Sequence, residues 1–406
     1  MTVTLDQIKA AAELLDGQII RTPLVPAGRL SRQVGCELYL KLENLQYTGS
    51  FKDRGSYVKL NSLTAEQRKA GVIAMSAGNH AQGVAYHAQR LGIPATIVMP
   101  EFAPYSKVER TKSCGARVVL TGDTLDASAV AAREIAAEEG LSFVHPYDDE
   151  KIIAGQGTIG LELLEDQPDL DAIVVPIGGG GVISGIATAI KALKPEIEIF
   201  GVEVELFPSM YQTIHEMAPT SGGTTLADGI AVKNPGELTR EIIKQHVKEI
   251  LLVDESGIEG AVHKLCELQK VVAEGAGAAG VAAILEQPSR FQGKKVAAVV
   301  CGGNIDVRLL SAVLARGMVR DGRLVRLRVS IVDQPGVLAK LTTFIGECGA
   351  NIIEIAHQRL FYNVPPKQAE IDLIVETRNA EHLHEIMARL KAGGFPVRVM
   401  SSRSDV

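Results

Sequence analysis

The sequence predicts an α/β protein with a mainly parallel sheet, followed by a smaller domain of the ferredoxin-like βαββαβ plan. Up to about residue 315, short apolar runs alternate with helical patterns, which is typical of parallel strands joined by helices. From residue 325 onwards, the order changes to strand, helix, strand, strand, helix and strand. A chain of 406 residues is long enough for two or three domains.

The first predicted elements begin with a buried strand at residues 71–76. It leads into Ala77-Gly-Asn-His80, and a helix follows through Arg90. The apolar run at residues 95–99 is stopped by Pro100, as expected at the end of a strand. The other elements of this group are a strand at residues 117–120 and an alanine-rich helix at about residues 128–139.

The same unit recurs later in the chain. A strand at residues 171–176 leads into Gly178-Gly-Gly-Gly181, and a helix follows to Leu193. Residues 199–203 and 295–300 are further strands, and the second ends at Cys301-Gly-Gly-Asn304. Because ligands bind at the carboxyl edge of open parallel sheets, we expect these turns to lie at a binding site.

A polar, basic and glycine-containing stretch at residues 316–324 predicts a linker between residues 1–315 and a C-terminal domain at residues 325–406. Within that domain, apolar alternation predicts strands and amphipathic runs predict helices. The strands are expected at residues 325–332, 352–360, 369–377 and 396–400, and the helices at residues 337–348 and 382–391.

Composition and charge argue against several classes of protein. A formal net charge of −6 and the absence of Trp speak against a nucleic-acid partner. No run approaches the roughly 18 apolar residues of a membrane span, and the start at Met1-Thr-Val-Thr lacks the features of a signal peptide. The five cysteines are scattered without a CxxC pair, which predicts a cytoplasmic protein without a zinc site or disulfide framework.

Ser50-Phe-Lys-Asp-Arg-Gly55 places a lysine beside an aromatic ring, in a loop ahead of a predicted helix. A lone lysine is most often a solvated surface group. A lysine whose pKa is lowered can instead form a Schiff base with an aldehyde cofactor. This hexapeptide alone leaves both interpretations open.

Gly178-Gly-Gly-Gly181 lies between a buried strand and a helix, where backbone N–H groups and the helix dipole attract an anion. A flexible turn is the alternative, but the entropic cost of so many glycines needs a reason. A dinucleotide fingerprint is absent, because neither GxGxxG frame that starts at Gly178 or Gly179 ends in glycine. With no Walker A loop either, a single phosphate monoester fits best.

Two further turns follow predicted strands. Ser76-Ala-Gly-Asn-His80 precedes a helix N-terminus, which suits a carboxylate, and the amide of Asn79 can hydrogen-bond a ring oxygen. An ordinary helix start capped by Ser76 or Asn79 is the alternative. In Cys301-Gly-Gly-Asn304, a single cysteine is more often a small buried hydrophobe than a functional thiol.

Together and in this order, these motifs resemble the β-family, or fold type II, of pyridoxal-phosphate enzymes, most closely its threonine/serine ammonia-lyases. The resemblance extends to about residue 315 and includes Thr225-Leu-Ala-Asp-Gly-Ile-Ala231. It implies a tryptophan-synthase β-like fold of two open parallel sheets, with a smaller subdomain at about residues 45–150 inserted in a larger one. It also implies pyridoxal 5'-phosphate as cofactor and conversion of L-threonine to 2-oxobutanoate and ammonia, with L-serine, which gives pyruvate, as secondary substrate.

The resemblance also implies roles for single residues. Lys52 would hold the cofactor covalently and later act as the general base. Phe51 and Gly229 would lie against the cofactor ring, Asn79 would contact its hydroxyl group, and Cys301 would meet its pyridine nitrogen. The phosphate would be held by Gly178, Gly179, Gly180 and Gly181, and the substrate would be framed by Ser76, Ala77, Asn79 and His80.

The sequence departs from some relatives at informative positions. Serine racemases of this family commonly carry serine where this chain has Ala77, and alanine cannot transfer a proton, so racemisation is expected to be minor. Glu203 matches one ligand of a divalent-cation site in those relatives, but Phe207 and Ser209 replace the others, so no obligatory metal is predicted. Glu274 resembles an acidic position near the active site, although a carboxylate at a helix start explains it equally well.

Asp333-Gln-Pro-Gly336, followed by Asn351-Ile352, resembles an ACT domain, a regulatory module that often binds amino acids at domain interfaces. A plain turn is the alternative, because proline and glycine are common turn residues. The resemblance implies a homo-oligomer, a dimer or tetramer, and an amino-acid or nucleotide effector at Asp333, Gly336, Asn351 and Ile352. Serine racemase or 3-hydroxyaspartate ammonia-lyase activity and a non-catalytic amino-acid sensor stay open as other functions.

Overall fold

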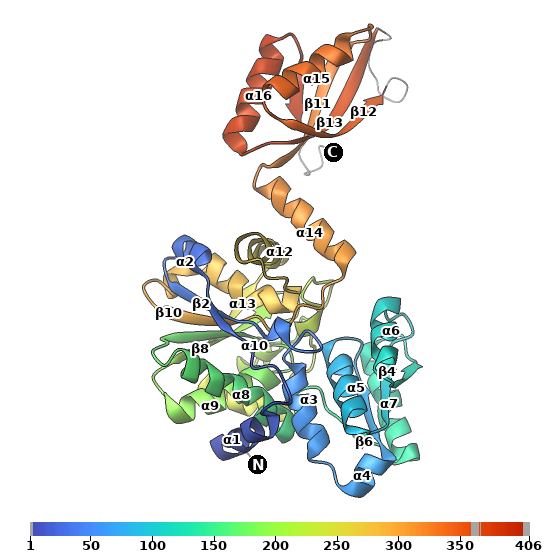
Figure 1. Cartoon of the computed structure of the whole chain (residues 1–406), viewed down its shortest axis with the longest axis vertical. Coiled ribbons are helices and arrows are strands. Elements are labelled where there is room, and N and C mark those ends of the chain that lie inside the picture. Colours follow the sequence, from blue (N-terminus) through green and yellow to red (C-terminus); the bar gives the residue numbers. More distant parts are fainter. Residues whose placement is uncertain (1–2, 359–364, 366, 401–406) are drawn as a thin grey trace. The chain divides into compact units, whose positions relative to one another are not determined.

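The computed structural model describes residues 3–358, 365 and 367–400, and the chain divides into two compact units, Met1–Ile305 and Asp306–Val406 (Figure 1). The first unit contains a six-stranded and a four-stranded sheet, and the second contains another four-stranded sheet. Within the described part of the chain, no helix combines the length and the apolar character needed to cross a membrane.

The six-stranded sheet is parallel except at one edge. In spatial order its strands are β1 (Leu24–Pro26), β2 (Glu37–Lys41), β10 (Lys295–Val299), β7 (Ala172–Pro176), β8 (Glu198–Val204) and β9 (Glu249–Val253). The predicted parallel sheet is therefore confirmed, with β7, β8 and β10 at the predicted places. β1 runs antiparallel to β2 and was not predicted, because three residues that end in proline give no alternating pattern.

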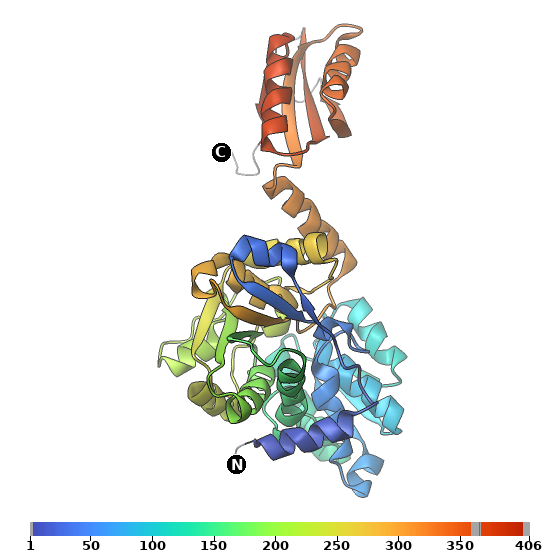
Figure 2. The ribbon, with the colours of Figure 1, turned by 60° about the vertical axis from the view of Figure 1, so that its left-hand side comes forward.

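Helices cover both faces of this sheet (Figures 1 and 2). α1 (Leu5–Leu15), α8 (Glu150–Asp166) and α9 (Gly181–Leu193) lie on one face, and α2 (Gly28–Val34), α12 (Glu255–Lys264) and α13 (Gly275–Glu286) lie on the other. All five residues of β7 are buried as a result. A strand covered on both faces reads as a continuous apolar run, which is why the sequence shows it so clearly.

The four-stranded sheet of the first unit forms a smaller subdomain, and all its strands are parallel. Its strands are, in spatial order, β5 (Arg117–Leu120), β4 (Ala95–Met99), β3 (Val72–Met75) and β6 (Ser142–Phe143). The predicted strands at residues 71–76, 95–99 and 117–120 are confirmed. Its helices are α4 (Ala65–Ala70), α5 (Asn79–Leu91), α6 (Tyr105–Ser113) and α7 (Leu125–Glu139).

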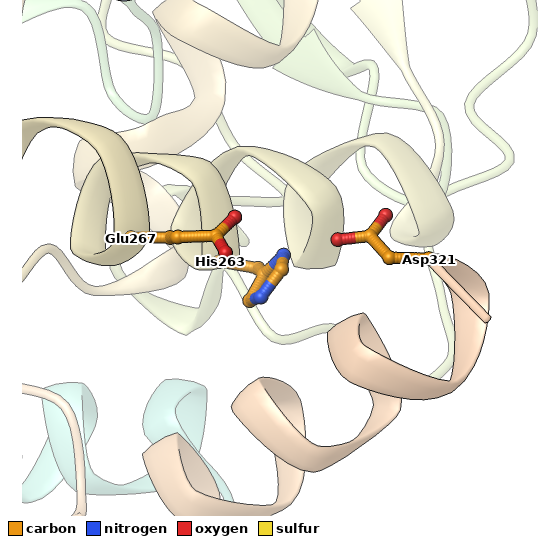
Figure 3. Close-up of side chains that lie close together, drawn as sticks. All are labelled: His263, Glu267 and Asp321. Carbon is orange, nitrogen blue, oxygen red and sulfur yellow. The ribbon is translucent and has the colours of Figure 1, made fainter. Parts of the chain in front are cut away.

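Shorter helical segments complete the first unit. α12 continues into a π-helical turn, η3 (Leu265–Gln269), and His263 and Glu267 present their side chains on the same side of this segment (Figure 3). Lys270 then ends the helix in the left-handed region at φ 59°. The other segments are η1 (Glu43–Leu45), α10 (Ser209–Ile214), η2 (Asp228–Ile230), α11 (Glu237–His246) and η4 (Pro288–Arg290).

α3 (Lys52–Asn61) begins at Lys52 and packs closely against α8. A β-carbon on Gly155 would lie 2.7 Å from the Cα atom of Gly55, so only glycine at these positions lets the two helix backbones meet. The close approach places the start of α3 firmly on the large subdomain.

A buried network of charges holds α3 in this place. Arg54 donates to Glu43 at 2.8 and 2.7 Å and to Glu162 at 2.6 and 2.8 Å. Lys41 donates to Glu162 at 2.5 Å and to the carbonyl of Thr22 at 2.7 Å. Arg54 and Lys41 are both 0% exposed. Two cations meet two anions here, which is the condition under which buried charges are tolerated.

The second unit forms an antiparallel sheet with two helices packed on it, in the predicted order βαββαβ. Its core joins Leu327 and Val329 of the central strand to Leu341 and Ile386 of the two helices. Residues 359–360 of one predicted strand lie outside the described residues. The elements are β11 (Leu324–Val332), α15 (Val337–Glu347), β12 (Asn351–Gln358), β13 (Gln368–Glu376), α16 (Ala380–Ala392) and β14 (Val397–Val399).

The first five residues of the predicted linker at residues 316–324 are helical, and its last residue, Leu324, begins β11. α14 (Val307–Arg320) begins after Asp306, whose carboxylate accepts the N–H groups of Arg308 and Leu309 at 3.0 and 3.2 Å. A single glycine costs a helix only about 1 kcal/mol, so Gly317 does not end it. The two units accordingly divide after Ile305 instead of after residue 315.

We predict that Arg54→Met lowers the free energy of unfolding by about 3–5 kcal/mol, because Glu43 and Glu162 then keep buried charges without their main partner. Arg21→Met is the matched control, since Arg21 pairs with Glu165 and Asp166 at the surface. Arg21→Met should lower the free energy of unfolding by less than about 1 kcal/mol. Chemical denaturation followed by circular dichroism measures both losses, and equal losses would contradict the role given to the network.

Candidate active site

Lys52 carries an amine suited to covalent chemistry. Its Nζ donates to the carbonyl of Pro146 at 2.6 Å and lies 5.0 Å from the centre of the Phe51 ring. Burial lowers the pKa of the amine to about 8. A useful fraction of Lys52 is therefore neutral near physiological pH, and a neutral amine is the nucleophilic form.

Cys301 follows β10 after Val300 and interacts electrostatically with Lys52. Its carbonyl accepts the N–H of Phe51 at 3.1 Å, which ties the start of α3 to the end of β10. The side chain is 3% exposed, and burial raises the pKa of the thiol well above its usual range. Cys301 therefore offers a neutral S–H group.

His80 is a buried neutral histidine. Burial, together with the nearby charge of Lys52, lowers its pKa to about 3. Its Nε2 lies 2.9 Å from the carbonyl of Val144, and a carbonyl can only accept, so Nε2 carries the proton. Nδ1 is then an acceptor, and it has no partner among the described residues. The side chain of His80 has no N–H left to give to a carboxylate.

The turn before α5 has the geometry of a ligand site. The residue that precedes α5 is Gly78, and no side chain caps this helix, so the alternative of an ordinary start capped by Ser76 or Asn79 is wrong. Ser76 instead accepts the N–H of Gly78 at 3.1 Å through its hydroxyl oxygen. Ala77 lies between them, half-buried. The N–H groups of the first turn of α5 are left for another partner.

The buried Glu274 pairs with the half-buried Asn79. Asn79 Nδ2 donates to Glu274 Oε1 at 2.7 Å, and Asn79 Oδ1 accepts from Asn304 Nδ2 at 2.8 Å. Burial and the nearby Asp228 raise the pKa of Glu274 to about 7. Gly229 borders this pair, because a β-carbon there would lie 3.8 Å from Glu274 Oε1. The structure thus brings Asn79, Gly229 and Glu274 together.

The glycine loop between β7 and α9 leaves no room for side chains. A β-carbon on Gly179 would lie 2.2 Å from the ring of Tyr147, and Gly180 has a φ of 92°, which strains any other residue. No side chain caps α9. A loop of this shape at the N-terminus of a long helix presents N–H groups to an anion.

The carboxylate of Glu203 binds the N-terminus of α10. It is 1% exposed, and its two carboxylate oxygens accept the N–H groups of Met210 and Tyr211 at 2.9 and 2.8 Å. Phe207 is buried before α10, and Ser209 is the first residue of that helix. The carboxylate therefore closes the N-terminus of α10.

The four predicted effector residues do not meet within the second unit. Asp333 and Gly336 follow the end of β11, where Val332 pairs with Gln368. Asn351 pairs with Glu376, at the opposite end of the same sheet, and Ile352 follows it. A cavity of about 340 Å³ lies at the Asn351 end and is lined by Arg323, Gly349, Asn351, Glu376, Thr377 and Arg378.

Sequence reasoning missed two groups that shape the site. The carbonyl of Pro146 accepts from Lys52, and the ring of Tyr147 packs against Gly179. A backbone carbonyl gives no signal in a sequence, since every residue has one. Tyr147 lies far from the glycine loop along the chain, and no motif marks it.

The chain belongs to a family of pyridoxal-phosphate dependent enzymes, whose family model matches residues 15–302. An ACT domain model matches residues 321–393, so both expected resemblances are confirmed. The L-threonine ammonia-lyase of Thermotoga maritima is 48% identical over 400 residues, which cover 98% of this chain and 100% of that protein.

Solved structures share a similar fold over about three quarters of this chain. The processed form of threonine deaminase isoform 2 from Solanum lycopersicum is 36% identical with a TM-score of 0.72, and the match covers 76% of this chain and 86% of that one. A maize serine racemase is 34% identical with a TM-score of 0.74, and that match covers 79% and 99%. Similar folds therefore occur in proteins named for two different reactions.

The residues present fit pyridoxal phosphate. Lys52 offers an amine that can bind an aldehyde, and the glycine loop would collide with Tyr147 if it carried side chains. The neutral thiol of Cys301, whose carbonyl accepts the N–H of Phe51, can face an uncharged ring nitrogen. A reactive amine, an anion cradle and a neutral polar group are the three contacts that an aldehyde with a phosphate tail and a pyridine ring needs.

We predict that Lys52 of the cofactor-free protein titrates with a midpoint near pH 8. Reductive methylation with formaldehyde over a range of pH, followed by peptide mass spectrometry, measures the neutral fraction of each lysine. The exposed Lys69 of α4 serves as internal reference for the reagent. Because burial disfavours the ammonium form, methylation of Lys52 should level off above about pH 9. A rate that still climbs steeply with pH there would contradict the lowered pKa.

Proposed function

We propose that this chain converts L-threonine to 2-oxobutanoate and ammonia by α,β-elimination, and L-serine to pyruvate and ammonia as a secondary activity. The amine of Lys52, with its lowered pKa, is the observation that carries this function. Identity of 48% to an L-threonine ammonia-lyase over 98% of the chain supports threonine as the substrate.

Bound pyridoxal phosphate supplies a conjugated ring that accepts the electron pair left when the substrate Cα loses its proton. We assign its phosphate to the N–H groups at Gly178, Gly179, Gly180 and Gly181, where the helix dipole of α9 adds to the attraction. We assign its ring to the space between Phe51 and Gly229, and its hydroxyl group to Asn79. Lys52, Phe51 and Cys301 are joined to one another by the contacts described above.

Lys52 is assigned two tasks. It is the covalent attachment point of the cofactor, and as a free amine it accepts the proton from the substrate Cα. A base works best when its pKa lies near the working pH, and a pKa of about 8 meets this condition where an exposed lysine would not.

We assign Cys301 to the pyridine nitrogen of the cofactor. A neutral thiol there would not stabilise a positive charge as a carboxylate would. Cys301 would thereby favour loss of the β-hydroxyl group over transamination.

The substrate carboxylate is assigned to the start of α5. The N–H groups of its first turn have no side-chain cap, and the hydroxyl of Ser76 lies beside them. His80 is assigned to carboxylate binding through the backbone of that turn, because its ring has no free N–H group. Ala77 offers the substrate only its methyl group and its backbone.

We infer that the second unit regulates this activity by binding a small effector, as ACT domains do. The cavity beside Asn351 is lined by two arginines and by Glu376, so it offers both signs of charge, which suits an amino acid. Asp333 and Gly336 lie at the other end of the sheet, so a site that uses all four residues needs a second copy of the chain. We therefore propose a homo-oligomer.

We also propose a cytoplasmic location, which the five unpaired cysteines support.

We predict that Lys52→Ala abolishes both the visible absorption of the loaded protein and the release of 2-oxo acid from L-threonine. Lys69→Ala, which removes an exposed lysine of α4, should leave both unchanged. Absorption spectra and a coupled 2-oxo acid assay measure the two effects. Turnover by the wild-type protein would also exclude a purely sensory role, and turnover by Lys52→Ala would contradict the proposed chemistry.

We predict that L-serine gives pyruvate with D-serine below about one hundredth of that amount, an estimate that rests on the loss of a second acid–base group worth 10²-fold or more. The maize serine racemase among the structural neighbours makes this comparison necessary. Chiral chromatography of the reaction mixture measures D-serine. D-serine in amounts similar to pyruvate would contradict the argument from Ala77.

A separate assay of 2-oxo acid release uses 3-hydroxyaspartate as the other candidate substrate. Adding isoleucine, valine or AMP to the same assay tests whether any of them is an effector.

A further inference from the structure

A chain of hydrogen bonds links the residue after Lys52 to Glu274. Asp53 accepts the N–H and the hydroxyl group of Thr48 at 2.9 and 2.6 Å. The carbonyl of Thr48 accepts from Asn304 Nδ2 at 2.7 Å, and the same Nδ2 donates to Asn79 Oδ1 at 2.8 Å. Asn79 Nδ2 then donates to Glu274 at 2.7 Å. Four separate segments of the first unit are joined in this way.

The donor and acceptor roles along these hydrogen bonds are fixed by the carbonyl of Thr48. An amide side chain can present either its oxygen or its nitrogen, but the carbonyl of Thr48 can only accept a hydrogen bond. Asn304 must therefore turn its Nδ2 toward Thr48, and its second N–H points at Asn79. Because Asn79 Oδ1 is occupied by that N–H, its Nδ2 faces Glu274.

The side chain of Asn304 packs closely against the turn at Gly49. A β-carbon on Gly49 would lie 2.8 Å from Asn304 Oδ1, and Gly49 has a φ of 75°. The N–H of Gly303 donates to the carbonyl of Gly49 at 2.9 Å. The turn at Gly49 therefore holds the Asn304 loop in place through a backbone hydrogen bond and close packing.

We propose that Asn304 is a positioning residue that orients the amide of Asn79, so that Asn79 presents an N–H group to the ring oxygen of the cofactor. The inference rests on the proposed function, in which Asn79 contacts that oxygen. Asn79 Nδ2 has two N–H groups, and only one is used by Glu274. The second N–H is a donor for an oxygen that carries negative charge, and a flipped amide would present a repelling oxygen instead.

The test compares two cofactors on the cofactor-free protein by absorption titration: pyridoxal 5'-phosphate and its 3-deoxy analogue, in which hydrogen replaces the ring hydroxyl group. In Asn304→Asp, a carboxylate replaces the amide without a change of shape, so it cannot donate to Thr48 or to Asn79. Asn79 then turns its Nδ2 toward residue 304. The dissociation constant for pyridoxal phosphate should rise at least tenfold, and that for the 3-deoxy analogue should rise less than threefold.

Asn44→Asp is the matched control. Asn44 lies beside the same turn and donates to the carbonyl of Val272 at 3.1 Å, and in the described part of the chain it makes no hydrogen bond with Asn79. Both dissociation constants should stay within twofold of wild type. If Asn304→Asp fails to fold by circular dichroism, Asn304→Ala replaces it, with the same selective loss expected.

If Asn304→Asp weakens the binding of both cofactors equally, or of neither, the positioning role of Asn304 is overturned. These outcomes are independent of the proposed reaction, which is judged on wild-type protein alone. A wild-type protein that binds the cofactor but releases no 2-oxo acid from L-threonine or L-serine would refute the proposed function, and the comparison of dissociation constants would still decide the role of Asn304.

Discussion

The site depends on keeping one lysine amine partly neutral next to two buried charges. Asp53 and Arg54 follow Lys52 directly, and both are 0% exposed. Asp53 is satisfied by Thr48, and Arg54 is satisfied by Glu43 and Glu162. Because each charge has its own partner, neither pairs with Lys52. A carboxylate paired with the amine would raise its pKa and remove the neutral form, so the separate partners preserve the chemistry.

The fold supplies the other half of the site from the ends of parallel strands. β3 leads into the turn before α5, and β7 leads into the glycine loop before α9. β10 leads to Cys301, whose carbonyl holds the N–H of Phe51. Both helices begin without a side-chain cap, so each offers its N–H groups and the positive end of its dipole. The two helix starts can therefore bind two anionic groups, such as the phosphate of a cofactor and the carboxylate of a substrate.

Much of this could be predicted from the sequence, for physical reasons. Strands such as β7 are buried on both faces and read as continuous apolar runs, and the glycine loop stands out because glycine is costly without a purpose. The partners of these groups were not predictable. Pro146 meets Lys52 through a backbone carbonyl, and the orientation of Asn79 is set by Asn304 from a distant turn. The helical start of the stretch predicted as a linker was missed because its polar, basic and glycine-containing composition is typical of linkers, although one glycine does not end a helix.

The most direct test of the account is to find where the cofactor is attached. The protein is loaded with pyridoxal phosphate, reduced with borohydride to fix any bond to an amine, digested and analysed by peptide mass spectrometry. The account predicts a single labelled peptide, modified at Lys52. A label on another lysine, or no label after reduction of a loaded sample, would contradict it.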